Sequence, residues 1–133
     1  MTTVRPFASG ANRDTDLGKN DYEGFLSPWV LERYGDYMTR HRVLPDGSLR
    51  DSDNWQLGIP PNQYMKSLIR HVFHLWKLHR QVALDREEVK DACCAVMFNV
   101  MGYLHEELKP LDQPRRHKFP PPSPEELLWK LNK

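Results

Sequence analysis

The chain has 133 residues, with 19 Lys and Arg against 18 Asp and Glu and a formal net charge of +1 at pH 7. This length suits one domain with a single core. Because the positive and negative charges nearly balance, there is no reason to expect nucleic acid or an acidic membrane as a partner. The longest wholly apolar stretch, residues 92–98, is far shorter than the roughly 18 residues that span a membrane. We therefore expect a cytoplasmic protein that neither crosses a membrane nor binds nucleic acid.

The first segment, residues 1–20, is rich in Ser, Gly, Asn and Asp and poor in large apolar side chains. Such a composition does not offset the entropy of ordering the backbone, so we expect a flexible, irregular arm. A helix is predicted from Ser27 to about Arg42, because Ser27 can cap it and Pro28 suits the first helical position.

A turn is predicted at residues 45–47 and a long loop over residues 48–58, which show neither helical nor strand periodicity. The next helix is expected from near Pro61 to about Gln81, because apolar residues recur there every three or four positions. We interpret this helix as part of the core.

A third helix is predicted over residues 85–109, where Asp85 and Glu88 have the spacing of a capping box and Pro110 ends the segment. The adjacent Cys93 and Cys94 would point about 100° apart, which disfavours a disulfide between them. The segment 111–133 is expected to be a proline-rich tail with a short terminal helix from Ser123.

These elements predict an all-α fold, a small bundle of about three main helices plus a short C-terminal helix. The expected organisation is an arm over residues 1–20, a helical domain over residues 21–110 and a tail over residues 111–133. A long loop separates the first two main helices.

A polar stripe follows the third helix. At about 100° per residue, Glu88, Asp91, Asn99 and His105 face one way together with Ala95 and Gly102. The other central residues are apolar, so we expect the helix to be buried on almost all sides. Buried polar groups need partners, and the stripe therefore requires an explanation.

Two explanations remain open for this stripe. In the first, Glu88 simply caps the helix, Asp91 pairs with an arginine such as Arg70, and Asn99 bonds a neighbouring loop. Alternatively, Glu88 and Asp91 at positions i and i+3 present oxygen ligands to a hard cation such as Mg²⁺. Because Asn99 and His105 lie about 12 Å and 21 Å from Asp91 along the axis, they cannot share that cation.

The preceding helix offers a complementary surface. Ser67, His71 and His74 are expected on one face, with Arg70 beside them. An arginine and imidazoles opposite carboxylates could hold a polyphosphate between the two helices. For each single histidine, an ordinary half-exposed position remains the alternative.

The order of these motifs resembles a known family. The residues concerned are Asp53-Asn54-Trp55-x-x-Gly58-Ile59, Ser67-Leu68-x-Arg70-His71, Glu87-Glu88-x-x-Asp91-x-x-x-Ala95-x-x-x-Asn99 and Leu104-His105-Glu106. Together they are similar to the phage-borne family named for a dATP/dGTP diphosphohydrolase N-terminal domain, over about residues 13–108.

The resemblance implies a relative of the MazG-type all-α nucleotide pyrophosphohydrolases, which are dimers or tetramers. In such enzymes Mg²⁺ held by helix carboxylates activates a water that attacks a phosphorus. Glu88 and Asp91 match their E-x-x-D metal ligands. MazG-type enzymes also carry an E-E-x-x-E motif on the preceding helix, whereas residues 61–81 of this chain hold no carboxylate. Further metal ligands would therefore come from loop residues such as Asp53, Glu23 or Asp21, or from a second subunit.

The leading hypothesis is therefore Mg²⁺-dependent hydrolysis of a purine deoxynucleoside triphosphate to the monophosphate and pyrophosphate. Glu88 and Asp91 would bind metal, Arg70 and Lys66 phosphates, and His71 or His105 would position water or substrate. Trp55 could stack on the base, or merely cover the core, and Asn54 or Asn99 could read the base edge. The rival hypothesis is a non-catalytic phage accessory protein that binds a nucleotide or a host protein.

Overall fold

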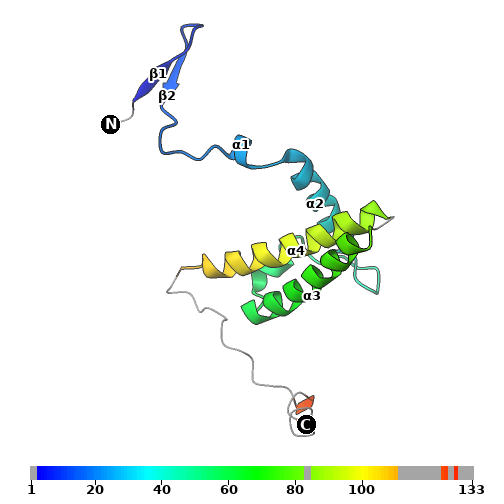
Figure 1. Cartoon of the computed structure of the whole chain (residues 1–133). Coiled ribbons are helices and arrows are strands. Elements are labelled where there is room, and N and C mark those ends of the chain that lie inside the picture. The colour runs from blue at the N-terminus through cyan, green and yellow to red at the C-terminus, as the bar shows by residue number, and fades with distance from the viewer. Residues whose placement is uncertain (1–2, 83–84, 111–123, 126–127, 129–133) are drawn as a thin grey trace. The chain divides into compact units, whose positions relative to one another are not determined.

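The computed structural model describes residues 3–82, 85–110, 124–125 and 128. They form two compact units, residues 1–33 and residues 34–133. The elements are β1 (Val4–Pro6), β2 (Asn12–Asp14), α1 (Tyr22–Phe25), α2 (Pro28–Arg40), the single 3₁₀ turn η1 (Asn54–Leu57), α3 (Pro61–Arg80) and α4 (Arg86–Glu107). Figure 1 shows them in chain order. The chain is thus mostly helical, as expected, with one small sheet that the sequence analysis did not anticipate.

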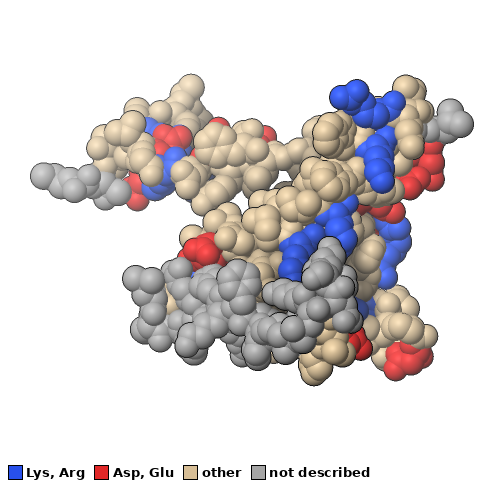
Figure 2. Space-filling model, turned by 60° about the horizontal axis from the view of Figure 1, so that its bottom comes forward, with Lys and Arg blue, Asp and Glu red and all other residues tan. Residues whose placement is uncertain are grey.

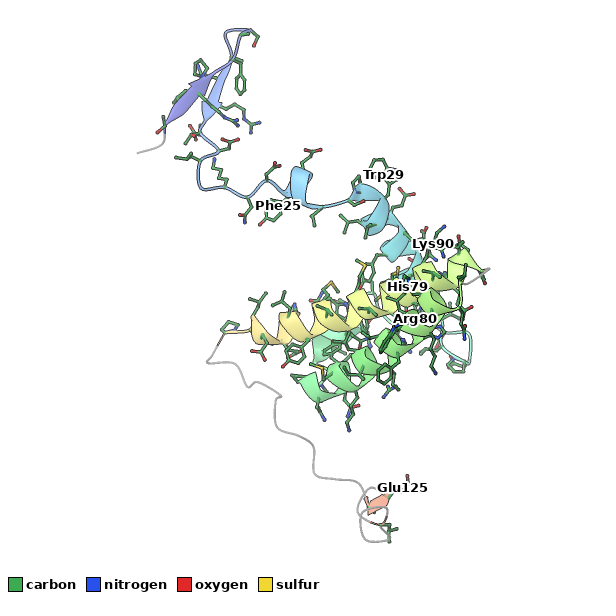
Figure 3. All side chains as sticks on the ribbon, in the orientation of Figure 1. Phe25, Trp29, His79, Arg80, Lys90 and Glu125 are labelled. Carbon is green, nitrogen blue, oxygen red and sulfur yellow. The ribbon has the colours of Figure 1, made fainter. Side chains whose placement is uncertain are left out.

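The N-terminal unit begins with a hairpin in place of the expected irregular arm. β1 and β2 pair antiparallel with Val4 opposite Asp14, and Arg5 secures the pair by an ion pair with Asp16 at 3.1 Å. A positive φ at Gly10 closes the turn. Phe25 and Trp29, which follow the hairpin in this unit, are 74% and 81% exposed (Figure 3). The expected arm is therefore corrected to a short hairpin held by local hydrogen bonds.

The predicted helix bounds are confirmed within two residues. The Ser27 hydroxyl accepts a hydrogen bond from Val30 N at 3.3 Å, and Asp85 accepts bonds from the backbone of Glu87 and Glu88. α3 begins at Pro61, as the periodicity indicated. The proline-rich segment 115–122 lies outside the described residues, and of the expected C-terminal helix only Pro124, Glu125 and Leu128 are described, in helical conformation.

The helical unit is built on α3 and α4, which run antiparallel and side by side (Figure 1). Tyr64 of α3 lies against Gly102 of α4, and its ring meets Phe98 edge to face with centroids 5.9 Å apart. Tyr37 of α2 packs on Cys94 and Ala95 of α4. Small side chains on α4 therefore let two aromatic rings approach its backbone.

The expected burial of α4 on all sides is wrong. Ala95, Asn99 and Gly102, which belong to the predicted polar stripe, are the buried side. The apolar side chains opposite are exposed, among them Val100 at 47% and Leu104 at 54%. On α3 likewise, Ile69 and Trp76 are about half exposed although that helix was expected to be core. The two helices pack through small and aromatic residues and leave an apolar surface open.

Among the residues that the structure describes, three buried oxygen atoms near this packing have no hydrogen-bond partner: Tyr34 Oη, Tyr64 Oη and Glu106 Oε2. Glu106 is 1% exposed, and its other oxygen accepts a bond from Lys109 Nζ at 2.8 Å. Burial raises the pKa of Tyr64 to about 12, and the carboxylate of Glu106 adds to that shift. Tyr64 is therefore a neutral phenol throughout the physiological pH range.

Candidate functional site

The main pocket of the helical unit has a volume of about 360 Å³ and is formed by the end of α2, the following loop, α3 and α4. That volume falls within the usual range of about 300–1,000 Å³ for small-molecule sites. It brings together Asn54, Trp55, His71 and Asn99, four residues that the sequence analysis selected. It is also lined by residues that the sequence did not single out: Tyr37, His41, Arg42 and Arg50.

The loop after α2 supplies the two arginines. The backbone of Arg50 donates to Arg42 O at 2.9 Å, and Arg42 Nε donates to Arg50 O at 2.9 Å. The predicted turn is confirmed between them, with Gly47 at a φ of 85° and Leu44 N bonded to Ser48 O. The turn therefore brings Arg42 and Arg50 together as cationic residues of the pocket.

These arginines could have been identified from the sequence. A turn at residues 45–47 makes the flanking segments antiparallel, and Val43 pairs with Leu49 in a bridge. Residues 42 and 50 are then direct neighbours across that pairing. Tyr37 and His41 are neighbours by helical spacing, at positions i and i+4, and His41 Nδ1 lies 2.8 Å from Tyr37 O. That they line this pocket depends on how the end of α2 packs, for which the sequence carried no comparable signal.

Trp55 lies in the 3₁₀ turn η1 and forms an aromatic part of the pocket wall. Its ring meets the ring of His105 on α4 edge to face, with centroids 4.8 Å apart. His105 does not line the pocket and instead supports Trp55 from α4. The two predicted roles of Trp55, a base platform and a cover for the core, are therefore compatible in one side chain.

Two polar side chains from the helices complete the pocket. Asn99 is 4% exposed and donates from Nδ2 to Ala95 O at 2.8 Å. His71 is partly buried, and burial is the largest cause that lowers its pKa. Positive charge on Arg70, His74 and His41 lowers the pKa of His71 further. The His71 ring is thus neutral at pH 7, when it can both donate and accept a hydrogen bond.

The two predicted metal ligands lie outside the lining of the main pocket. Arg40 of α2 holds Asp91 through both guanidinium nitrogens, with Nη2 to Oδ1 at 2.7 Å and Nη1 to Oδ2 at 3.4 Å. Glu88 Oε1 lies 3.3 Å from His74 Nε2. Asp91 is therefore paired with an arginine, as one of the two explanations had it, although the partner is Arg40 and not Arg70.

This arrangement does not fit Mg²⁺ as it stands. Both carboxylates already face a cationic or imidazole partner, and Mg²⁺ needs free oxygen ligands near octahedral geometry. Among the described residues, no three His, Cys, Asp or Glu side chains are grouped as a metal site would require. Glu88 and Asp91 would have to leave their partners before either could bind the ion.

The two predicted phosphate ligands on α3 lie elsewhere. Lys66 and Arg70 line a separate open groove with Met65, Ile69 and Tyr103, and Arg70 Nη2 donates to Ser67 Oγ at 3.0 Å. Because successive helical residues diverge by about 100°, Arg70 and His71 point to different hollows. The predicted site is thus divided: Asn54, Trp55, His71 and Asn99 meet, while Lys66, Arg70, Glu88 and Asp91 do not join them.

Comparison of the chain with models of known protein families, with curated proteins and with solved structures gives no match. Within the described residues, no helix has both the length and the apolar character to span a bilayer.

Proposed function

We propose that the chain binds a purine deoxynucleoside triphosphate in the main pocket. The observation that carries this proposal is the meeting of Arg42 and Arg50 with the indole side chain of Trp55 in the lining of one cavity. Arginine side chains suit phosphate because they donate in a planar fork. An indole ring suits a purine because stacking requires only a flat apolar surface. Asn99, buried at the pocket wall, is an amide of the kind that reads a base edge.

Hydrolysis to the monophosphate and pyrophosphate, with Mg²⁺, is the second part of the proposal. The family resemblance and the E-x-x-D spacing of Glu88 and Asp91 support it. The Arg40 and Asp91 side chains are 54% and 36% exposed, so water reaches both groups of this pair.

Binding without hydrolysis is the second candidate, and the pairing of both carboxylates favours it. A chain whose acidic residues are held by Arg40 and His74 can still present the pocket to a nucleotide. In that case the chain would sequester a nucleotide or present it to another protein. The two candidates differ in whether pyrophosphate is released.

One experiment separates these candidates. Equilibrium dialysis with dGTP and dATP measures binding in EDTA, and a pyrophosphate assay with Mg²⁺ measures turnover. We expect binding in EDTA, and pyrophosphate release that is lost in Asp91→Ala, because Asp91 is a proposed metal ligand. Release that is unchanged in Asp91→Ala contradicts the role of this carboxylate. Binding without release supports the second candidate, and no binding at all overturns both.

The affinity for the triphosphate should rise as the pH falls. In the free chain the lowered pKa of His71 keeps its ring neutral at pH 7. A bound polyanion favours the protonated ring and raises that pKa, so binding takes up a proton. Linkage then predicts tighter binding as the pH drops from about 7 to about 6.

Isothermal titration calorimetry in two buffers of different ionisation enthalpy measures this proton uptake directly. In the His71→Gln variant, fewer protons should be taken up when the triphosphate binds, and the triphosphate should still enter the pocket. An unchanged uptake in that variant would assign the proton to another group and contradict the prediction for His71.

A homo-oligomer, either a dimer or a tetramer, remains a prediction. The exposed apolar residues Val100, Met101 and Leu104 on α4 support it, because large exposed apolar patches are typical of protein interfaces.

A further inference from the structure

The open groove on α3 is the most distinctive surface that the proposed function leaves unused. We call it the α3 groove; its volume is about 700 Å³. Met65, Ile69 and Tyr103 are large apolar or aromatic side chains of its lining, and Lys66 and Arg70 are its two cations. Met65 and Ile69 are 43% and 47% exposed, so these apolar side chains remain available to an occupant.

The charge on α3, the helix that supplies most of the residues lining this groove, is of one sign. α3 contains four Lys and Arg residues and neither Asp nor Glu. Figure 2 shows Lys and Arg side chains on the helical part of the molecule in the view that turns the lower side of Figure 1 forward. A groove lined by apolar side chains and cations selects a segment that combines carboxylates with apolar side chains.

The C-terminal segment of the same chain has this composition. Its residues 124–131 read Pro-Glu-Glu-Leu-Leu-Trp-Lys-Leu. Two carboxylates therefore precede a run of large apolar residues. Leu128 is 59% exposed, and Glu125 is exposed as well (Figure 3).

The chain is long enough to bring this segment to the groove. Tyr103, in the groove lining, precedes the end of α4 at Glu107 by four residues, or about 6 Å along the axis. The groove thus lies beside the end from which the tail departs. Residues 111–123 connect the two parts, and an extended polyproline chain of that length spans up to about 40 Å.

We propose that residues 124–131 dock in the α3 groove of their own chain. Glu125 and Glu126 pair with Lys66 and Arg70, and the leucines that follow cover Met65 and Ile69. This contact gives a function to the two cationic residues that the main pocket does not use. It is also independent of nucleotide binding and can be tested without a nucleotide.

Carbodiimide cross-linking of the full chain tests the proposal, because this reagent joins a lysine amine to a carboxylate only when the two touch. We expect peptide mapping by mass spectrometry to recover Lys66 joined to Glu125 or Glu126. Lys77, an exposed lysine of the same helix outside the groove, is the internal control and should give several-fold less product with these carboxylates.

Variants that leave the reacting groups in place make the test sharper. Ile69→Ser should lower the Lys66 product several-fold, whereas Val72→Ser, at an exposed position of α3 outside the groove, should not. Equal yields at Lys66 and Lys77, or a yield that Ile69→Ser does not change, overturn the proposal. A mixture of ¹⁵N-labelled and unlabelled chains should give no mixed-isotope product; such a product would identify a second copy as the source of the segment and overturn docking within one chain.

Discussion

Gly102→Ala is expected to destabilise the chain by about 2 kcal/mol, because overpacking costs up to about 3 kcal/mol and the helix propensity of alanine returns about 1 kcal/mol of that loss. A Cβ at this position would lie 2.7 Å from Tyr64 Oη and closer still to two carbons of the ring. Tyr64 is 2% exposed, so its ring has no open space into which it can turn. Either α3 must move away from α4 or the ring must leave its rotamer.

The helix propensity of alanine opposes this loss. Alanine is better than glycine inside a helix by about 1 kcal/mol, and the net loss stated above already includes that gain. Urea denaturation followed by circular dichroism measures the free energy of unfolding for both proteins. An unchanged or increased stability of Gly102→Ala would contradict the contact between Tyr64 and the α4 backbone.

Gly35→Ala is the matched control. Gly35 also lies within a helix, α2, and a Cβ there would meet nothing within 4 Å. Only the propensity gain applies at this position, so the variant should be more stable than the wild type by about 0.5–1 kcal/mol. Opposite effects of the same substitution at the two positions separate packing from propensity.

Local sequence signals were sufficient to predict where the three main helices begin and end, whereas the four-residue helix α1 was not predicted. The cap at Ser27 and the cap at Asp85 act within three residues of their own positions, so their effect does not depend on the rest of the fold. The hairpin at residues 4–14 escaped prediction because its strands are three residues each. Such strands are too short to show an alternating pattern.

The direction in which α4 faces could not be predicted from its hydrophobicity. The helix turns Ala95 and Gly102 inward because a small side chain admits the rings of Tyr37 and Tyr64. Close packing of α4 against these two rings therefore determines its orientation, and burial of its largest apolar side chains does not. Leu104 and its neighbours on α4 remain outside as a result.

The partner of Asp91 shows a second limit of sequence reasoning. Arg40 lies 51 positions away in the chain and reaches Asp91 only because the C-terminal end of α2 packs on α4 through Tyr37. Arg70 had the right charge and was expected on the adjacent helix, but the rotation of α3 directs it to the groove. Helical spacing predicts which residues share a face, whereas the rotation of one helix against another is a property of the assembled core.

Arg50→Ala should weaken triphosphate binding by about tenfold or more, since a hydrogen bond to a charged group contributes about 1.5–3 kcal/mol. Its exposed side chain belongs to the main pocket, and its backbone, not its guanidinium, maintains the pairing with Arg42. The substitution therefore removes a cation without removing the turn. Arg42→Ala is less suitable as a test because Arg42 Nε also holds Arg50 O.

Lys77→Ala provides the control for charge. Lys77 is an exposed cation of α3 that the main pocket does not include, and its loss changes the net charge by the same amount. If both variants weaken binding equally, the effect is a general attraction of the chain for anions, and Arg50 has no specific role. Dialysis with dGTP at two salt concentrations measures the affinity of each variant and the part of each loss that salt screens.

Trp55→Ala should weaken binding by about tenfold to a hundredfold, because stacking of one base on an aromatic side chain contributes about 1–3 kcal/mol. Trp55→Phe should retain most of the affinity, since a flat ring remains beside His105. The pattern expected across nucleotides is more informative than either number alone. Arg50→Ala should affect the triphosphate more than the monophosphate, whereas Trp55→Ala should weaken both equally, because phosphates and base contact different residues of one pocket. Equal losses of affinity for both variants with both the triphosphate and the monophosphate would mean that the pocket has collapsed. Circular dichroism of each variant would then show the change in structure.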